Sequence, residues 1–145
     1  MSGVLAAILF FLGTALLFYV LFAGADFGAG ILELFLGRGQ REEQRKLITR
    51  AMAPVWEANH VWLIFVLVTL WTAFPAAFAP IMSTLYVPLT LAAVGIILRG
   101  AAFAFRKASE TLPLRRWFGV TFASASFLTP FMLGAVVGGV ASAVR

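Results

Sequence analysis

The sequence contains no cysteine and only one histidine, and just 12% of its 145 residues are charged. Without cysteine the chain can form neither a disulfide framework nor an iron–sulfur or thiolate metal site. One histidine cannot provide bis-histidine ligation of a haem, so we expect this chain to ligate no cofactor axially. Instead, 62% of the residues are hydrophobic and the mean hydropathy is +0.99. These values lie far outside the soluble globular range and predict an integral membrane protein.

Four apolar runs are each long enough to cross a hydrocarbon layer of about 30 Å. They cover residues 4–36, 53–78, 80–105 and 117–144. We therefore predict an all-α fold, a single four-helix transmembrane bundle over residues 1–145. Almost nothing polar separates the second run from the third, which favours a tight turn there. Pro54 would lie in the first turn of the second helix, where its missing N–H does no harm.

The basic residues predict the orientation in the membrane. Nine of the eleven Lys and Arg lie in the first and third connectors, whereas the N-terminus and the second connector have none. By the positive-inside rule both basic connectors face the cytoplasm, which places both termini outside. The pI near 10.8 therefore reflects topology, so we expect contact with membrane lipid and no nucleic-acid partner.

Four ionisable residues fall inside the predicted spans, namely Asp26, Glu57, His60 and Arg99. A charge at the bilayer centre costs at least about 2.5 to 3.5 kcal/mol on the insertion scale, so each needs a partner or a function. Counting at about 1.5 Å per residue from the cytoplasmic ends places all four in one layer. They form either a proton-exchanging group or a set of polar contacts between helices. Glu33, nearer the end of the first span, is expected to snorkel to the interface.

Local sequence adds detail to two of these positions. Gly24 and Gly28 flank Asp26 and predict a groove where another helix or a flat ligand approaches the backbone. Glu57 and His60, three residues apart, are predicted to share one helix face. A similar glycine pair, Gly134 and Gly138, has no acid nearby and indicates plain helix packing.

Four segments in this order and spacing resemble subunit II of cytochrome bd quinol oxidases. They are FAGADFGAG at 22–30, FLGR at 35–38, APVWEANHVW at 53–62 and ILRGAAF at 97–103. The resemblance extends over most of the chain but only over the first four-helix half of such a subunit. A split-gene half, a truncated paralogue and an incomplete sequence are all compatible with it.

The resemblance implies a subunit of a quinol:oxygen oxidoreductase in a bacterial or archaeal cell membrane. The partner, cytochrome bd subunit I, would carry haem b and haem d, oxidise quinol and reduce oxygen to water. This chain would ligate no haem, would not be catalytic alone, and would act as a scaffold with a second half-bundle chain as a further partner. The complex would help to generate a proton motive force.

The same resemblance implies roles for individual residues. Glu57 follows Trp56 where the family commonly has Asp, and would belong to a proton pathway with Asp26 and His60. Arg99, Asp26 and Trp56 would maintain the haem region or form a structural ion pair. From the residues alone, half of a proton-coupled transporter completed by dimerisation, or a purely structural subunit, are the alternatives.

Overall fold

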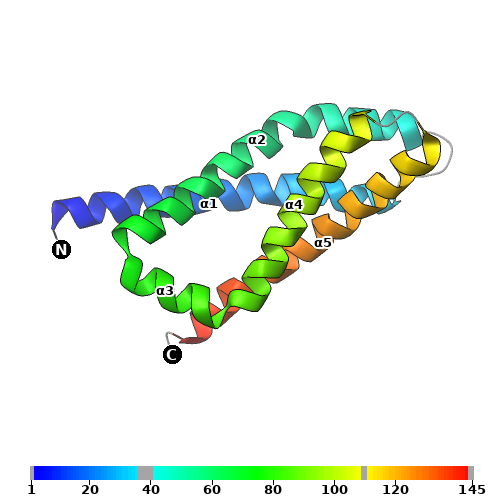
Figure 1. Cartoon of the computed structure of the whole chain (residues 1–145). Coiled ribbons are helices and arrows are strands. Elements are labelled where there is room, and N and C mark those ends of the chain that lie inside the picture. The colour runs from blue at the N-terminus through cyan, green and yellow to red at the C-terminus, as the bar shows by residue number, and fades with distance from the viewer. Residues whose placement is uncertain (1, 36–40, 109–110, 144–145) are drawn as a thin grey trace.

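The computed structural model describes residues 2–35, 41–108 and 111–143, and over these residues the chain is helical with no strand. The elements are α1 (Gly3–Leu32), η1 (Glu33–Phe35), α2 (Arg41–Ala73), α3 (Pro75–Thr84), α4 (Tyr86–Ala108) and α5 (Leu112–Ala143) (Figure 1). Four of these helices are long and apolar enough to cross a membrane, over residues 3–32, 46–73, 86–105 and 113–143. The predicted all-α class with four spans is confirmed.

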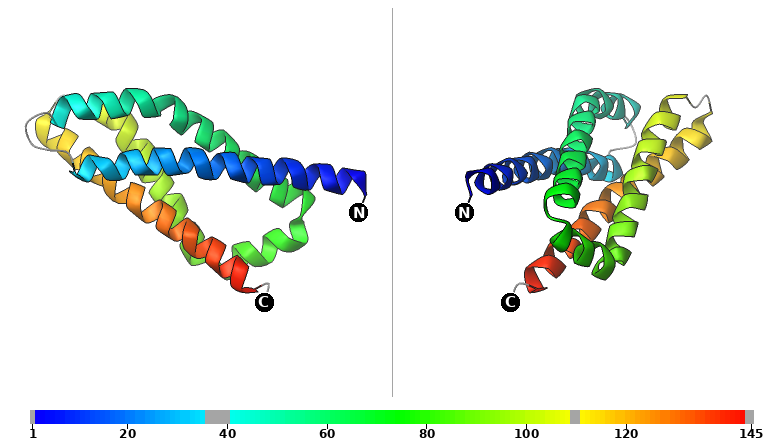
Figure 2. Two further views of the ribbon diagram at one scale, coloured as in Figure 1. Left: turned by 180° about the vertical axis from the view of Figure 1, so that it is seen from behind. Right: turned by 60° about the vertical axis from the view of Figure 1, so that its left-hand side comes forward.

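The long helices pack as two pairs. α1 packs against α2 and α4 packs against α5, while the two pairs meet mainly where α1 crosses α5. Figures 1 and 2 show both chain termini at one end of the molecule. The end of α1 and the start of α2 lie at the other end, beside the end of α4 and the start of α5. Because these pairs cross at an angle, the most buried side chains gather where α1 meets the other helices.

α1 begins where a polar side chain can cap it. The Ser2 hydroxyl accepts a hydrogen bond from the Leu5 N–H at 3.4 Å, which satisfies one of the free donors of the first turn. The helix then runs for 30 residues. Every fourth residue or so from Leu12 to Phe27 is buried, and these positions form the stripe that faces α2.

α2 begins earlier than the hydropathy of the sequence predicts. It starts at Arg41, so the described part of the expected polar connector is already helical. The charged side chains there are good helix formers and extend the helix beyond the apolar span. Pro54 consequently lies inside the helix, and its predicted place in a first turn is wrong. Since proline removes an internal hydrogen bond, it accounts for the bend of α2 in Figure 1.

The predicted tight turn near residue 79 is also wrong. A separate short helix, α3, joins α2 to α4, so the third predicted span is divided at Leu85. Pro75 at the start of α3 and Pro88 in the first turn of α4 each suit the beginning of a helix. These two prolines thus favour two helix starts where hydropathy alone suggests one continuous run.

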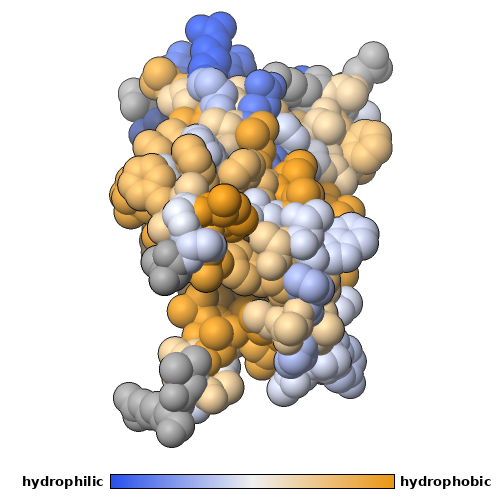
Figure 3. Space-filling model, turned by 90° about the vertical axis from the view of Figure 1, so that its left-hand side faces the viewer, coloured by the Kyte–Doolittle hydropathy of each residue, from blue (hydrophilic) through white to orange (hydrophobic). Residues whose placement is uncertain are grey.

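The outer faces of all four long helices are apolar. Large hydrophobic side chains are exposed on each of them, among them Phe10, Ile64, Ile97 and Phe131. Figure 3 shows the most hydrophilic residues gathered along one edge, with hydrophobic and weakly polar residues over the rest of that face. In lipid or against a partner protein these apolar side chains are not exposed to water. The apolar outer faces therefore agree with a membrane-spanning bundle.

Candidate functional site

An ion pair between α1 and α4 lies at the centre of the candidate site. Arg99 Nη1 donates to Asp26 Oδ2 at 2.6 Å and Nη2 donates to Oδ1 at 2.7 Å. Nη2 also donates to the Asp26 backbone carbonyl at 3.0 Å. The exposed fraction is 1% for Asp26 and 2% for Arg99. Two parallel hydrogen bonds to one carboxylate give the strongest geometry that an arginine can offer.

Aromatic rings enclose the guanidinium group from two helices. Arg99 Cζ lies 4.7 Å from the centroid of the Phe27 ring and 4.8 Å from that of the Phe122 ring. The faces of these rings attract a cation, and they also exclude water from the pair. Phe122 comes from α5, so this ion pair joins three helices. Breaking it would leave a buried charge without compensation.

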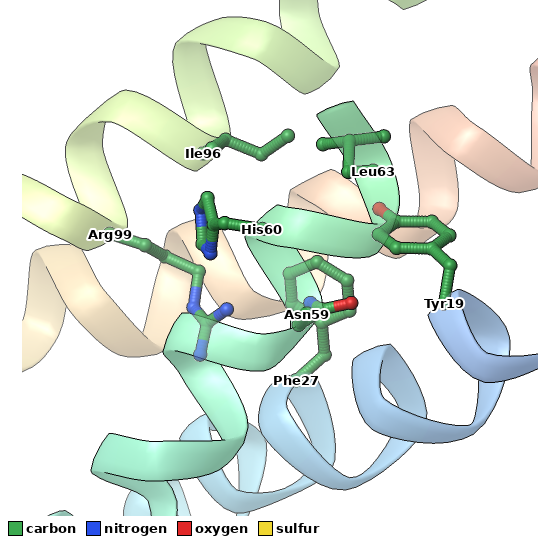
Figure 4. A pocket seen from close by; sticks show the side chains of 7 residues that line it. All are labelled: Tyr19, Phe27, Asn59, His60, Leu63, Ile96 and Arg99. Atoms are coloured by element: carbon green, nitrogen blue, oxygen red, sulfur yellow. The ribbon is translucent and has the colours of Figure 1, made fainter. Parts of the chain in front are cut away.

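His60 and Trp56 lie one turn apart on α2 and hydrogen bond to each other. His60 Nδ1 donates to the Trp56 backbone carbonyl at 2.7 Å, because a carbonyl can only accept. The two rings are 4.5 Å apart between centroids, and Trp56 stacks on Phe103 of α4 at 5.8 Å. Trp56 therefore holds α2 against α4, while His60 points into the space between α1, α2 and α4 (Figure 4).

The structure does not bring Glu57 into this cluster. Its side chain is exposed on the outer face of α2, whereas Asn59 is 2% exposed and His60 is half-buried. Val61, Ile64 and Phe65 continue the same outer face, and all three are exposed. Of the predicted site residues, Asp26 and Arg99 are in contact, and His60 lines the same cavity as Arg99. Trp56 packs on His60 and Phe103, and Glu57 faces outward.

Glu33 lies where the sequence did not predict it. We expected it to snorkel to the interface, but it is 1% exposed in η1, which packs against α5. The tighter 3₁₀ geometry turns successive side chains by about 120° rather than 100°, which changes the direction of Glu33 relative to an ideal α-helix. Its burial adds a second acidic residue to the interior of the bundle.

Two further polar residues at the site were not singled out from the sequence, Tyr19 and Asn59. Tyr19 lies seven residues before Asp26, which is two turns along the same face of α1. Asn59 precedes His60 directly. Both are buried, with exposed fractions of 9% and 2%. Their helical spacing from the ionisable residues was the available signal.

A haem does not fit the cavity of the candidate site. The cavity beside His60 has a volume of about 10 Å³, enough for a water molecule and far too small for a haem or a quinone. No three His, Asp or Glu in the described part of the chain are grouped to hold a metal ion.

Comparison with known proteins identifies the family. The model of the family "cytochrome bd terminal oxidase subunit II" matches residues 5–145. The chain belongs to this family. The resemblance read from the four sequence segments is thereby confirmed, and the membrane-spanning helices are those of a multi-pass membrane protein.

Named relatives agree with the family assignment. The chain is 35% identical over 129 residues to cytochrome bd ubiquinol oxidase subunit 2 of Bacillus subtilis, and 31% identical over 126 residues to cytochrome bd-I ubiquinol oxidase subunit 2 of Escherichia coli K12. Each match covers 87% of this chain, but 37% and 33% of the respective relative. The chain thus spans about a third of the length of these relatives.

Proposed function

We propose that this chain is part of a quinol:oxygen oxidoreductase, in which it supports a haem-bearing partner and presents a carboxylate for proton uptake. The family match carries the first part of this proposal. The relatives from Bacillus subtilis and Escherichia coli are named as ubiquinol oxidase subunits. Haem b and haem d belong to the partner, cytochrome bd subunit I, and quinol is the substrate of the complex. The second half-bundle stays a prediction from the resemblance.

The position of Glu57 supports the second part. It is an exposed carboxylate on a face of α2 that is otherwise apolar, within a predicted membrane span. Facing lipid, an ionised carboxylate there would cost several kcal/mol. A protein surface that supplies water or a cationic partner removes this cost. We therefore place the haem-bearing subunit against the stripe of Glu57, Val61, Ile64 and Phe65, with Glu57 at the interface.

Protons would reach Glu57 from the cytoplasmic side. The helix continues from Glu57 back to Arg50 in about two turns, and Arg50 is exposed beside the basic connector. A carboxyl group accepts a proton from water and releases it again, which is the chemistry that a relay requires. Both carboxylate oxygens of Asp26 are bound by Arg99, so we assign Asp26 the structural role of holding the arginine. His60 is then the other predicted residue that could take part in the relay.

The test is to purify the complex through a tag on this chain and to measure haem content and quinol-driven oxygen consumption. Glu57→Gln should slow oxygen consumption at least tenfold with unchanged haem content, because the amide is nearly isosteric but carries no exchangeable acid. A tenfold change in rate corresponds to about 1.4 kcal/mol. Glu57→Asp should keep near-normal turnover, since it retains the acid.

Glu43→Gln is the matched control, because Glu43 is exposed near the start of α2, ahead of the apolar span. It should behave as the unmodified complex. Normal turnover of Glu57→Gln with full haem content would remove Glu57 from the proton route. A tagged chain that brings down no haem, and instead carries proton-coupled flux alone in liposomes, would favour the transporter alternative over the oxidase.

A further inference from the structure

A small internal cavity lies where α1, α2 and α4 meet. Its volume is about 10 Å³, which is about the smallest that can hold one water molecule. Figure 4 shows the side chains that surround it. The apolar part of the lining comes from Phe27, Leu63 and Ile96, and the polar part comes from Tyr19, Asn59, His60 and Arg99.

Three polar atoms of the lining residues are buried without a hydrogen-bond partner among the described residues. They are Tyr19 Oη, Asn59 Oδ1 and Arg99 Nε. Asn59 and Arg99 are each 2% exposed and Tyr19 is 9% exposed. A buried polar group without a partner costs about 1 to 3 kcal/mol. Three such atoms on residues that line one cavity each need a partner, because buried polar groups in proteins are nearly always hydrogen-bonded.

His60 contributes a fourth polar atom. Its Nδ1 must carry the proton, because it donates to the Trp56 carbonyl at 2.7 Å. In a neutral ring Nε2 is then an acceptor. Over the described residues no hydrogen bond to Nε2 is formed. The residues that line the cavity thus offer two donors, Tyr19 O–H and Arg99 Nε–H, and two acceptors, Asn59 Oδ1 and His60 Nε2.

We propose that this cavity holds one ordered water molecule bound by Tyr19, Asn59, His60 and Arg99. Water accepts two hydrogen bonds and donates two, which is the pattern that these four groups require. It would accept from Tyr19 and Arg99 and donate to Asn59 and His60. Buried waters make about three such bonds on average, so a four-partner site is at the well-satisfied end of their range.

Other occupants of this size fit the lining less well. A cation would lie beside the Arg99 guanidinium, which is itself positively charged. An anion such as chloride would face the lone pairs of Asn59 Oδ1 and His60 Nε2. An empty cavity would leave the buried polar atoms unsatisfied, whereas dry cavities in proteins are apolar. A neutral molecule that both donates and accepts is the class that matches.

The water would connect parts of the bundle that share few direct contacts. α2 and α4 meet less extensively than α4 and α5 or α1 and α2. Through the water, Asn59 and His60 of α2 would be linked to Arg99 of α4 and Tyr19 of α1. Arg99 also holds Asp26, so His60 and the ion pair become members of one hydrogen-bonded network. This role is independent of the enzymatic activity proposed above.

The direct test is a density map of the chain, extracted with the subunits that accompany it, at a resolution that shows ordered water. We expect a peak at about 2.7 to 3.2 Å from the four polar atoms. The map would contradict the proposal if the cavity were empty. It would also do so if Tyr19 and Asn59 had closed the cavity by bonding to each other directly.

A double-mutant cycle tests the same site in solution. Tyr19→Phe removes one donor and Asn59→Leu removes one acceptor, and each should lower the melting temperature by about 2 to 4 °C. If both side chains bind one water, the double variant should lose less than the sum of the two. Strict additivity would count against a shared molecule. Tyr86→Phe, at the exposed second tyrosine, is the control and should leave the melting temperature unchanged.

Discussion

Arg99 satisfies two kinds of partner at once. The guanidinium binds both oxygens of Asp26, and its Cζ lies over the rings of Phe27 and Phe122. A lysine ammonium could not reproduce this, because it has neither the planar fork nor the flat faces. The arginine is therefore specified by shape as well as by charge.

This geometry predicts the effect of replacing Arg99. Arg99→Leu should strand the Asp26 carboxylate and cost about 3 to 5 kcal/mol of stability. Arg99→Lys should cost less, since it keeps the charge although it loses the paired hydrogen bonds. Thermal stability and haem content of the purified complex are the measurements.

Two variants control for the loss of an arginine as such. Arg50→Leu makes the same chemical change at an exposed position of α2 and should have little effect. Adding Asp26→Asn to Arg99→Leu removes the stranded charge and should recover part of the loss. Equal, normal stability in Arg99→Leu and Arg99→Lys would mean that the ion pair does not hold the bundle together.

The sequence predicted some of these positions and misplaced others. The cost of burying a charge predicted that Arg99 needs a partner or a function, and the structure shows it paired with Asp26. The same argument cannot tell which side of a helix faces the interior when both sides are apolar. For this reason Glu57 was predicted in the inner layer and Glu33 at the interface, whereas Glu57 is exposed and Glu33 is buried.

At the level of elements, small residues decide where helices approach most closely. α1 crosses α5 at Gly30, and a Cβ added there would overlap with the Ser126 side chain. Ser126 is fully buried and donates its hydroxyl to the Phe122 carbonyl at 2.6 Å. By contrast, the glycines singled out from the sequence, among them Gly24 and Gly134, have no atom of the described residues within 4 Å of an added Cβ.

Gly30→Ala should therefore separate α1 from α5. Overpacking of this kind typically costs about 1 to 3 kcal/mol, which should appear as a lower melting temperature of the purified protein. Gly13→Ala on the same helix is the control, because among the described residues a Cβ there meets nothing within 4 Å. It should be neutral or slightly stabilising, since alanine favours helix.

A compensating substitution in α5 distinguishes steric overlap between the two helices from an unspecific loss of stability. Ser126→Gly in the Gly30→Ala background removes the overlapping atoms from the other helix and should restore part of the melting temperature. If Gly30→Ala matched Gly13→Ala, or if Ser126→Gly only added to its damage, the close contact between α1 and α5 would not be limiting.

The hydropathy of the sequence predicted the membrane-spanning helices more accurately than the residues at which they begin and end. Long apolar runs predicted the four spans, because a bilayer leaves few alternatives to a helix. The start of α2 at Arg41 and the separate α3 were missed. Both depend on helix propensity and proline positions in segments that hydropathy treats as connector or as one span. The Gly30 contact was missed because its partner, Ser126, lies 96 residues later.

For the molecule as a whole, the positions of the chain termini and of the basic connectors limit how the bundle can be oriented in the membrane. Both termini lie at one end of the bundle, and the described ends of the two basic connectors lie at the other (Figures 1 and 2). An even number of spans requires this. The arrangement leaves open which end of the bundle faces the cytoplasm. The clustering of Lys and Arg in the two connectors predicts that the end with the connectors faces it.

Labelling of single introduced cysteines tests this orientation, since the natural chain has none. Gln44→Cys near the start of α2 and Ser109→Cys, which lies outside the described residues, should resist a membrane-impermeant maleimide in intact cells. Ser2→Cys at the cap of α1 should react. After the cells are opened, the first two should also become reactive, which controls for sites that are merely covered by protein. Reaction of Gln44→Cys and Ser109→Cys in intact cells with protection of Ser2→Cys would reverse the topology, and Glu57 would then take up protons from the outer side.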